Sequence, residues 1–460
     1  MIGLLGLVVS LCALMYFAYK GVNVLILAPV CALVAVLFQT DLMNHASQGI
    51  LLTQYTHVFM GALSKYIFQY FPVFLLGAIF GKLMNDSRAA EVIGNGISKL
   101  LGPHHAILAT VLACGILTYG GVSLFVVAFC VLPISEALFA RAGIHRKYIP
   151  GSIALGSFTF TMTALPGTPS VQNAIPMPFF GTTSFAAPIL GIIAGLIMFG
   201  VGMMWMKYNS KKTTVNQMDV KATELEGLTP SLFMAMSPLL VVVITNFLFS
   251  DIIIPKWDPF FLVDNFQVAP AAVKGLWSII ISLAAAIIYV LIFFRKYSKG
   301  FVKSINEGTM SSLLPIFNTA SEVGYGAVIA GLASFVVLRD LILNIAPNNP
   351  LISEAVAVNL LAGITGSASG GMSIALQVLG QRYLEMANQL NISPELLHRV
   401  ATLSSGGFDT LPHNGAVISL LTICGMTHKD SYKDIFMVAV AIPVLATIVV
   451  IVLGSMFGSF

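Results

Sequence analysis

Two short stretches, TMTALPGTPSVQN at residues 161–173 and GGFDTLPHNGAV at residues 406–417, decide which fold this chain can adopt. Both combine Pro and Gly, which interrupt helices, with hydroxyl and amide side chains, and both lie between long apolar runs. Non-helical backbone at membrane depth is tolerated only where it is buried in protein or lines a cavity. The two stretches therefore predict broken helices around an internal site.

The composition of the 460-residue chain excludes a soluble globular protein. Hydrophobic residues make up 57% of the chain and charged residues only 9%, whereas roughly a quarter of the residues in a soluble domain are charged. Lipid must therefore be the solvent for most of the chain. The apolar runs predict an all-α polytopic membrane protein with about 11 to 13 transmembrane segments.

Charge and cysteine content exclude further classes of function. The net charge of +4 is spread over loops without a long basic run, which excludes a nucleic-acid surface. The five cysteines lie in apolar stretches without CxxC spacing, so we interpret them as packing thiols rather than disulfides or metal ligands. We expect no cofactor and no bound metal, apart from a coupling ion.

An internal repeat organises the chain. Leu165-Pro166 recurs as Leu411-Pro412, 246 residues later, and Gly120-Gly121 recurs as Gly370-Gly371, 250 residues later, which implies a four-residue deletion between the two motifs. The predicted domains are an N-terminal half, a polar cytoplasmic connector and a C-terminal half. Their bounds are 1–206 with a repeat core at 66–173, then 207–229, then 230–460 with a repeat core at 316–417.

Corresponding loops of the two halves differ in charge. The loops 82–103 and 141–147 are basic, whereas 344–350 contains no Lys or Arg. Because Lys and Arg near span ends mark the cytoplasmic side, the two copies should have opposite sidedness. The sequence thus predicts an inverted repeat, the pattern of secondary transporters whose substrate site lies at the bilayer midplane.

Two apolar runs are too long for single helices and should be broken within the membrane. We expect the run 104–140 to break at Tyr119-Gly120-Gly121 and the run 351–390 to break at Ser369-Gly370-Gly371. Half-helix amino termini and hydroxyl groups at such breaks would hold a carboxylate without a fixed positive charge, which predicts an anionic substrate. The alternative is that these small residues only let helices pack closely. The candidate substrate-binding residues are Tyr119, Gly120, Gly121, Ser123, Thr168, Ser170, Gln172, Asn173, Ser367, Ser369, Gly370, Gly371, Ser373, Ser405, Thr410 and Asn414.

Ionisable residues inside spans are energetically costly, so they are candidates for ion coupling. Asp409 and His413 lie four residues apart around Pro412 and could form a protonatable pair. The alternative is that Asp409 caps the half-helix that begins near Pro412. Glu322 is a third candidate, as the only acid between Met310 and Leu338. The alternative is that it lies near a helix end.

The other acids and histidines are predicted to need no function. Glu136, Glu354 and Glu385 lie near predicted span ends and should be exposed. His398 and the remaining histidines fall at loops or span ends, where we expect solvated or packing side chains.

Two other classes of function fit the sequence less well than a transporter does. An intramembrane hydrolase could use Ser405, His413 and Asp409, but the chain has no GxSxG, HExxH or paired-Asp signature. A channel would not need two discontinuous clusters, which suit occlusion of a solute better than a continuous pore. A transporter is the favoured interpretation.

Across nearly its whole length the chain resembles the gluconate permease (GntP) family of the ion transporter superfamily. The resemblance rests on PVFLLGAIFGKLM (72–84), YGGVSLFVVAFCVLPI (119–134), the Leu-Pro cluster 165–173 and SASGGMSIAL (367–376). It implies proton-coupled uptake of a small organic anion across the bacterial inner membrane. It also implies re-entrant hairpins in a mobile transport domain, elevator-like motion and a scaffold that forms a homodimer.

The chain departs from the sugar-acid permeases at two places. Those permeases carry a Tyr-Glu pair where this chain has Tyr119-Gly120, and a His-Pro-rich loop where it has residues 165–169. The stretch 408–417 looks more like the hydroxybutyrate permease branch. A less polar pocket favours a short-chain hydroxy acid such as 3-hydroxybutyrate over gluconate, and sodium remains an alternative to the proton as coupling ion.

Overall fold

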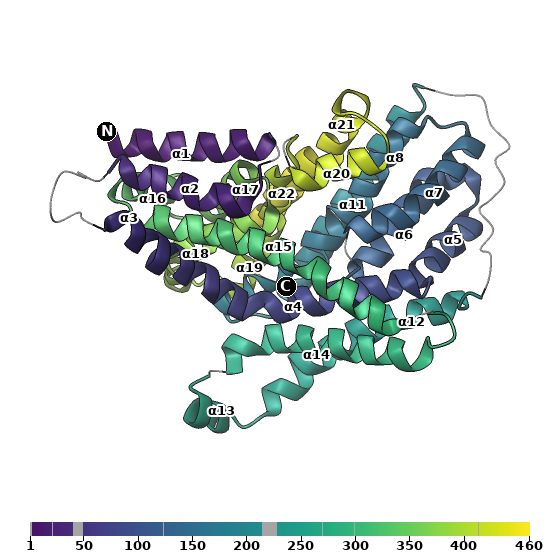
Figure 1. Cartoon of the computed structure of the whole chain (residues 1–460), viewed down its shortest axis with the longest axis horizontal. Coiled ribbons are helices and arrows are strands. Elements are labelled where there is room, and N and C mark those ends of the chain that lie inside the picture. The colour runs from purple at the N-terminus through teal and green to yellow at the C-terminus, as the bar shows by residue number, and fades with distance from the viewer. Residues whose placement is uncertain are drawn as a thin grey trace.

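The computed structural model describes residues 2–20, 22–39, 49–122, 124–213, 228–268, 270–298, 300–412 and 414–460. In these ranges all regular secondary structure is helical (Figure 1), which confirms the all-α fold class. Ser123, His413 and residues 214–227 of the connector lie outside the described residues.

The first half of the chain forms helices α1 to α11. Their bounds are α1 Ile2–Tyr19, α2 Val24–Leu37, α3 Ile50–Thr53, α4 Met60–Asp86, α5 Ala89–Leu101, α6 Ala106–Tyr119, α7 Leu124–Ala142, α8 Ile149–Ser157, α9 Val171–Ala174, α10 Met177–Phe180 and α11 Pro188–Ser210. A π-helical turn, Phe160–Ala164, follows α8 and leads into the first Leu-Pro loop.

The second half forms helices α12 to α22. Their bounds are α12 Leu232–Phe247, α13 Pro259–Phe266, α14 Pro270–Phe293, α15 Phe301–Ala330, α16 Ala333–Asn344, α17 Pro350–Thr365, α18 Ala368–Gln389, α19 Pro394–Ser405, α20 Gly415–Ile423, α21 His428–Phe436 and α22 Ile442–Phe457. A 3₁₀ turn, Phe408–Thr410, precedes the second Leu-Pro loop.

Several helical segments are long and apolar enough to cross a bilayer. Among the described residues five single segments pass this test, and α15 with α16 passes it as a sharply bent pair. Shorter apolar helices such as α6 and α17 are the pieces of the long runs that the sequence predicts to be broken. The single segments are Ile50–Asp86, Pro188–Ser210, Leu232–Lys256, Val273–Phe293 and His428–Phe457.

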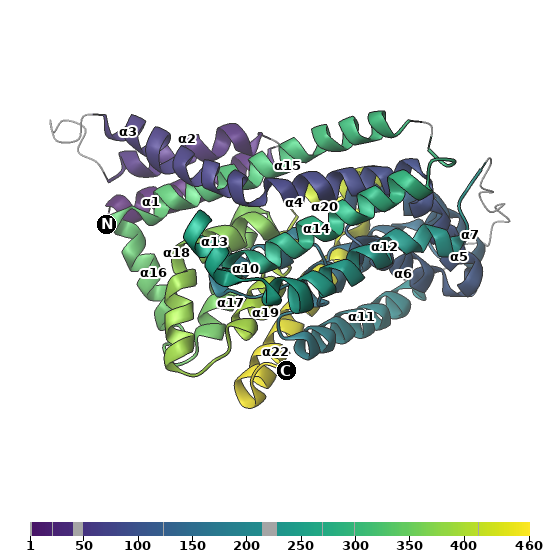
Figure 2. The ribbon, with the colours of Figure 1, turned by 90° about the horizontal axis from the view of Figure 1, so that it is seen from below.

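The order and packing of the helices repeat between the two halves. Helices α4 to α8 recur as α15 to α19, and α2 packs on α15 just as α14 packs on α4. The long helices α4 and α15 lie side by side (Figures 1 and 2). They run antiparallel, because Ser304 Oγ donates to Asp86 Oδ2 at 2.7 Å near one end and Gly324 lies against Phe59 near the other. Equivalent helices of opposite direction are what an inverted repeat requires.

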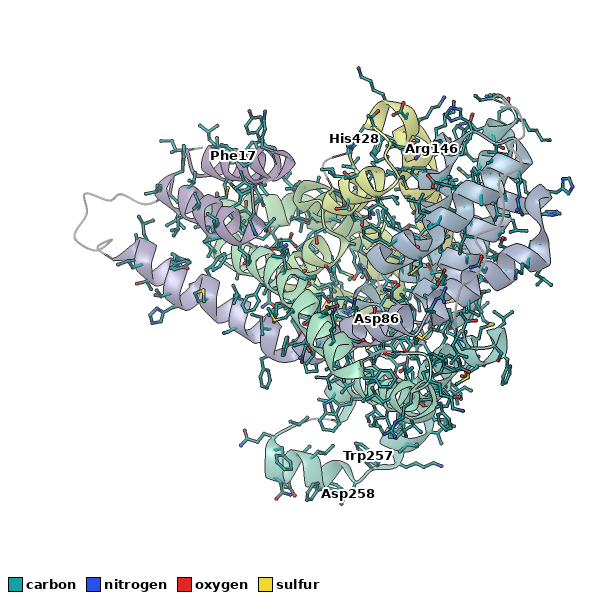
Figure 3. All side chains as sticks on the ribbon, turned by 45° about the vertical axis from the view of Figure 1, so that its right-hand side comes forward. Phe17, Asp86, Arg146, Trp257, Asp258 and His428 are labelled. Atoms are coloured by element: carbon teal, nitrogen blue, oxygen red, sulfur yellow. The ribbon has the colours of Figure 1, made fainter. Side chains whose placement is uncertain are left out.

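The basic loops gather at one end of the molecule. In Figure 1 helices α5 and α7, which border the basic loops, lie at the right, whereas α13 and α16 lie at the left. Arg146 and His428 lie close together in Figure 3, away from Trp257 and Asp258. Nη2 of Arg146 donates to the carbonyl of Cys424 at 2.9 Å, so the α7–α8 connection is fastened to the second half.

One predicted helix break is confirmed and the other is misplaced. Helix α6 ends at Tyr119, and Gly121 has a φ of +94°, which glycine adopts without strain. In the second half the helix ends earlier, because Gly366 (φ +65°) terminates α17 and Ser367 caps α18. Gly370 and Gly371 therefore lie in the first turn of α18. The ends of α6 and α17 are 246 residues apart, which is the Leu-Pro spacing, so no deletion is needed.

Candidate functional site

The first Leu-Pro loop docks on the end of α6. Tyr119 Oη donates to the carbonyl of Pro166 at 2.8 Å. A Cβ atom at Gly121 would lie 3.0 Å from Cγ of Pro169, so a larger residue there would press on the loop. The break after α6 and the loop therefore form one unit.

Asn173 and Ser170 hold this loop in shape. Asn173 Nδ2 donates to the carbonyls of Thr168 at 3.0 Å and Ser184 at 2.9 Å, while Ser170 Oγ donates to the carbonyl of Met162 at 2.7 Å. Because these groups are occupied by backbone partners, they position the loop. Thr168 is different, since its fully buried Oγ1 has no hydrogen-bond partner and is free to bind a ligand.

Helix α19 of the second half completes this first centre. The imidazole of His398 lies 3.1 Å from Asn173 Oδ1 and 2.6 Å from Thr182 Oγ1. Arg399 donates to the carbonyl of Ala186 through Nε at 3.1 Å and Nη2 at 2.6 Å. Both side chains are 0% exposed. His398 is thus a buried packing histidine, whereas no role was predicted for Arg399.

Arg399 is a buried cation without a carboxylate partner among the described residues, because no ion pair within 4.0 Å involves it. A guanidinium has five N–H donors, and hydrogen bonds occupy three of them, the third to the carbonyl of Thr163 at 3.4 Å. A buried, unpaired charge is costly unless a ligand supplies its counter-charge. The expectation that a carboxylate is held without a fixed positive charge stays a prediction, although Arg399 places such a charge beside the first Leu-Pro loop.

A second centre forms where α15 meets the start of α18. Ser367 Oγ accepts from the N–H of Gly370 at 3.1 Å, and Ser369 Oγ lies 3.3 Å from Thr319 Oγ1. The carboxyl of Glu322 faces Gly370, where a Cβ atom would lie 1.5 Å from Oε2. Glu322 is 5% exposed and its Oε2 has no hydrogen-bond partner. The structure thus brings together Glu322 and the predicted Ser-Gly cluster.

A small cavity adjoins this second centre. Its lining includes Tyr66 and Gln69 of α4 and Ser373 and Gln377 of α18, and its volume is about 20 Å³. Tyr66 Oη and Ser373 Oγ are buried and have no hydrogen-bond partner. The volume is close to what one water molecule needs, so a water or a small ligand atom could satisfy both groups.

The second Leu-Pro loop docks on the end of α17, as the first does on α6. Asn414 Nδ2 donates to the carbonyl of Gly366 at 2.7 Å, and its Oδ1 accepts from the N–H of Ala416 at 2.6 Å. Asn414 therefore caps α20, and the alternative that Asp409 is the cap is wrong. Asp409 is 5% exposed and its Oδ1 has no hydrogen-bond partner.

Some candidates serve local structure or helix packing in the described residues. Ser405 Oγ donates to the carbonyl of Thr402 within its own helix at 2.7 Å, and Thr410 Oγ1 donates to that of Ala439 at 2.8 Å. Gly371 packs so closely on α17 that a Cβ atom would lie 2.1 Å from the backbone nitrogen of Ala362, which is the close-packing role left as an alternative. Gln172 is partly buried in α9, next to Asn173 of the first centre.

Glu354 is a further buried acid. We expected it to be exposed, but it is 0% exposed and both carboxyl oxygens lack a hydrogen-bond partner. The prediction is wrong because Pro350 starts α17 four residues earlier, which carries Glu354 one turn into the bundle. Its acidic companions Glu136 and Glu385 are exposed, as expected.

Comparison with known proteins shows what kind of protein this is. The chain is 40% identical over 482 aligned positions to the uncharacterized transporter YxjC of Bacillus subtilis, with 99% of each chain covered. This chain belongs to the same transporter family. It is also 22% identical over 343 positions to an uncharacterized transporter of Haemophilus influenzae, with 74% of each chain covered. No protein-family model matches the chain.

Solved structures share the fold. The YdaH transporter of Alcanivorax borkumensis matches with a TM-score of 0.57 at 13% identity, covering 89% of this chain and 90% of that one. MtrF of Neisseria gonorrhoeae, described with a class of antimetabolite efflux pumps, matches with a TM-score of 0.56 at 12% identity over 94% of each chain. The protein is therefore a multi-pass membrane transporter. The comparisons support a transporter family, but they do not single out the gluconate permease family.

Proposed function

We propose that this transporter is a secondary active symporter that carries a small organic anion across the bacterial inner membrane together with protons. The observation that carries the proposal is Arg399. Its guanidinium is fully buried, and three of its five N–H donors are bound to backbone carbonyls. It has no direct counter-charge within 4.0 Å among the described residues, where Glu395, one turn back in α19, interacts with it only over a longer distance. A substrate carboxylate would supply that charge.

The surroundings of Arg399 suit a carboxylate. The free hydroxyl of Thr168 belongs to the loop that Asn173 holds next to α19, and Tyr119 anchors the same loop. Hydroxyl groups can donate to a carboxylate oxygen as well as accept from a substrate hydroxyl. Binding energy from this centre would favour an anion with one carboxylate over one with two, because Arg399 is the one fully buried basic side chain of the described residues.

The favoured substrate is a short-chain hydroxy monocarboxylate such as 3-hydroxybutyrate. Support comes from the resemblance to the hydroxybutyrate permease branch and from the single buried guanidinium. Gluconate and related sugar acids, and coupling to sodium, are the alternatives. The resemblance also supports a homodimer with elevator-like motion.

Proton coupling is proposed to involve Asp409, His413 and Glu322. Asp409 carries a buried oxygen without a hydrogen-bond partner, and it does not serve as a helix cap. A buried carboxyl that keeps an unpartnered oxygen is stabilised when it binds a proton.

The test is uptake by purified protein in proteoliposomes. Labelled 3-hydroxybutyrate and gluconate are supplied separately, each with a pH gradient or a sodium gradient. Accumulation of 3-hydroxybutyrate driven by the pH gradient supports the proposal. Uptake of gluconate instead would identify a sugar acid as the substrate. Accumulation driven only by the sodium gradient would overturn the proton coupling.

The variant that probes the anion site is Arg399→Gln, with Arg382→Gln as the matched control. Arg382 lies on α18, is 55% exposed and pairs with Glu385 at the surface. We expect the first variant to lose uptake and the second to keep it. Equal uptake by both variants would remove Arg399 from the substrate site.

A further inference from the structure

We infer that Glu322 is a proton-binding site with its own route to the molecular surface, through the cavity between α4 and α18, apart from the anion centre at Arg399. The inference deepens the proposed function and rests on it.

The first support is the set of groups around the carboxyl. Ser367 caps α18 with its Oγ, and the carboxyl of Glu322 lies against Gly370 in the first turn of that helix. A helix N-terminus stabilises an ionised carboxylate. The hydroxyl of Ser367, which interacts with this carboxyl, can donate to the ionised form and accept from the protonated form. The surroundings therefore tolerate both states of Glu322.

The second support is that the local electrostatics favour a proton over a metal cation. The positive end of the α18 dipole lies at the carboxyl and repels a bound cation. A proton carries its charge onto the carboxyl itself and leaves a neutral group.

The third support is the cavity. It extends from Lys65 and Gln377, which are exposed, to Tyr66 and Ser373, which are buried and have unpartnered oxygens. Tyr66 and Ser373 lie on the helices that flank Glu322. A water in this space would extend a hydrogen-bonded path from the surface to Tyr66 and Ser373. Val323, the residue after Glu322, also lines the cavity, and Tyr66 interacts electrostatically with the Glu322 carboxyl, so the path ends beside that group.

The other titratable groups facing this site are few in the described structure. From α4 these are Tyr66 and, at the mouth of the cavity, Lys65. Helix α2, which also packs on α15, has no charged residue. The charged residues of α18, Arg382 and Glu385, lie near its far end and pair with each other at 3.4 Å.

Glu354 offers a matched control. It is as deeply buried as Glu322 and also carries unpartnered oxygens, but it lies near Tyr383 in the far half of α18 rather than against the first turn of that helix. A general effect of removing a buried acid should therefore appear in both Glu322→Gln and Glu354→Gln. A proton site should appear only in the first.

The experiment uses the full chain in proteoliposomes with two readouts. The first is accumulation of labelled 3-hydroxybutyrate driven by a pH gradient, with internal pH followed by a trapped dye. The second is counterflow exchange of the same substrate at equal pH, which needs binding and movement but no net proton transfer. We expect Glu322→Gln to lose accumulation and proton uptake while it keeps exchange, and Glu354→Gln to keep all three.

A second variant keeps the inference testable if Glu322→Gln does not fold. Gly370→Ala places a methyl group where Oε2 of Glu322 now lies, so the flexible carboxyl must turn away while the backbone stays. Gly77→Ala on α4 is its control, because a Cβ atom there meets nothing within 4 Å. We expect Gly370→Ala to lose pH-driven accumulation and keep exchange, and Gly77→Ala to match the parent.

The outcomes separate the inference from the proposed function. If the parent protein accumulates substrate with the pH gradient and both Glu322→Gln and Gly370→Ala do the same, the proton site is wrong and the symporter stands. If the parent accumulates no anion under a pH gradient, the proposed function itself fails. Proton uptake that depends on external sodium would likewise overturn the inference.

Discussion

The two halves of the chain share an architecture but differ in the chemistry they bury. Among the described residues every buried acidic, basic or imidazole side chain belongs to the second half. The first half buries hydroxyls and amides instead, such as those of Thr168 and Asn173. The buried ionisable residues of the second half are Glu322, Glu354, His398, Arg399, Asp409 and Asp434.

This difference shows which property each copy contributes. Helix breaks and Leu-Pro loops occur in both copies, because they depend on glycine, proline and capping residues that build the frame. Buried charged side chains occur only in the second copy among the described residues. One of them, Arg399 of α19, contacts the first copy next to its Leu-Pro loop, through the carbonyl of Thr163. The anion centre is therefore shared between the halves, while the acidic centre around Glu322 lies mainly within the second half.

Removing the positive charge from the shared centre should have the largest effect. Arg399→Gln leaves a substrate carboxylate without its partner, which costs about 3 kcal/mol, or roughly a hundredfold in the apparent affinity for substrate. The measurement is the KM of uptake, with thermal unfolding followed in parallel because Arg399 also binds the carbonyl of Ala186. Arg399→Lys keeps the charge and should recover part of the affinity. If the variant loses stability but keeps the KM of the parent, Arg399 has a structural role and does not bind substrate.

Neutralising an acid of the second half should separate coupling from binding. Asp409→Asn is expected to abolish uphill uptake but to spare exchange, because the amide cannot take up and release the proton. Uphill accumulation and equal-pH exchange are measured on the same proteoliposomes. A variant that still concentrates substrate like the parent would show that Asp409 does not carry the coupling proton.

The fold was predictable because its signals are local in the sequence. Apolar runs, the Gly121 turn and the paired Leu-Pro motifs each act within a few residues. The break at 369–371 was misplaced because a Gly-Gly pair has two uses. In the first half it turns the chain, whereas in the second half Gly371 lets α18 approach Ala362 and Gly370 makes room for Glu322.

The charges of the site were harder to predict because burial depends on distant contacts. Arg399 follows Pro394 and Glu395 in a short polar stretch, which is typical of a span end. It is buried because carbonyls of residues 163 and 186, more than 200 positions away, accept its N–H groups. A basic residue followed by the small and apolar run 400–405 was the signal that could have identified it.

Smaller effects should follow when the docking of each Leu-Pro loop is weakened. Tyr119→Phe removes one hydrogen bond to Pro166 and should cost about 1 kcal/mol of stability. Asn414→Ala removes both the cap of α20 and the bond to Gly366, so we expect about 2 kcal/mol. Thermal unfolding in detergent ranks the two variants. The opposite ranking would show that the first loop, not the second, is the more tightly held.

The smallest effect is expected at Ser405, although it is as fully buried as Arg399. Its hydroxyl donates to the carbonyl of Thr402 one turn back in the same helix, so Ser405→Ala gives up only a local contact and leaves no other group unpaired. Uptake and unfolding temperature should match those of the parent. A strong loss of uptake would show that this hydroxyl faces substrate in another state of the transport cycle. Helix α19 would then contribute Ser405 as well as Arg399 to substrate binding.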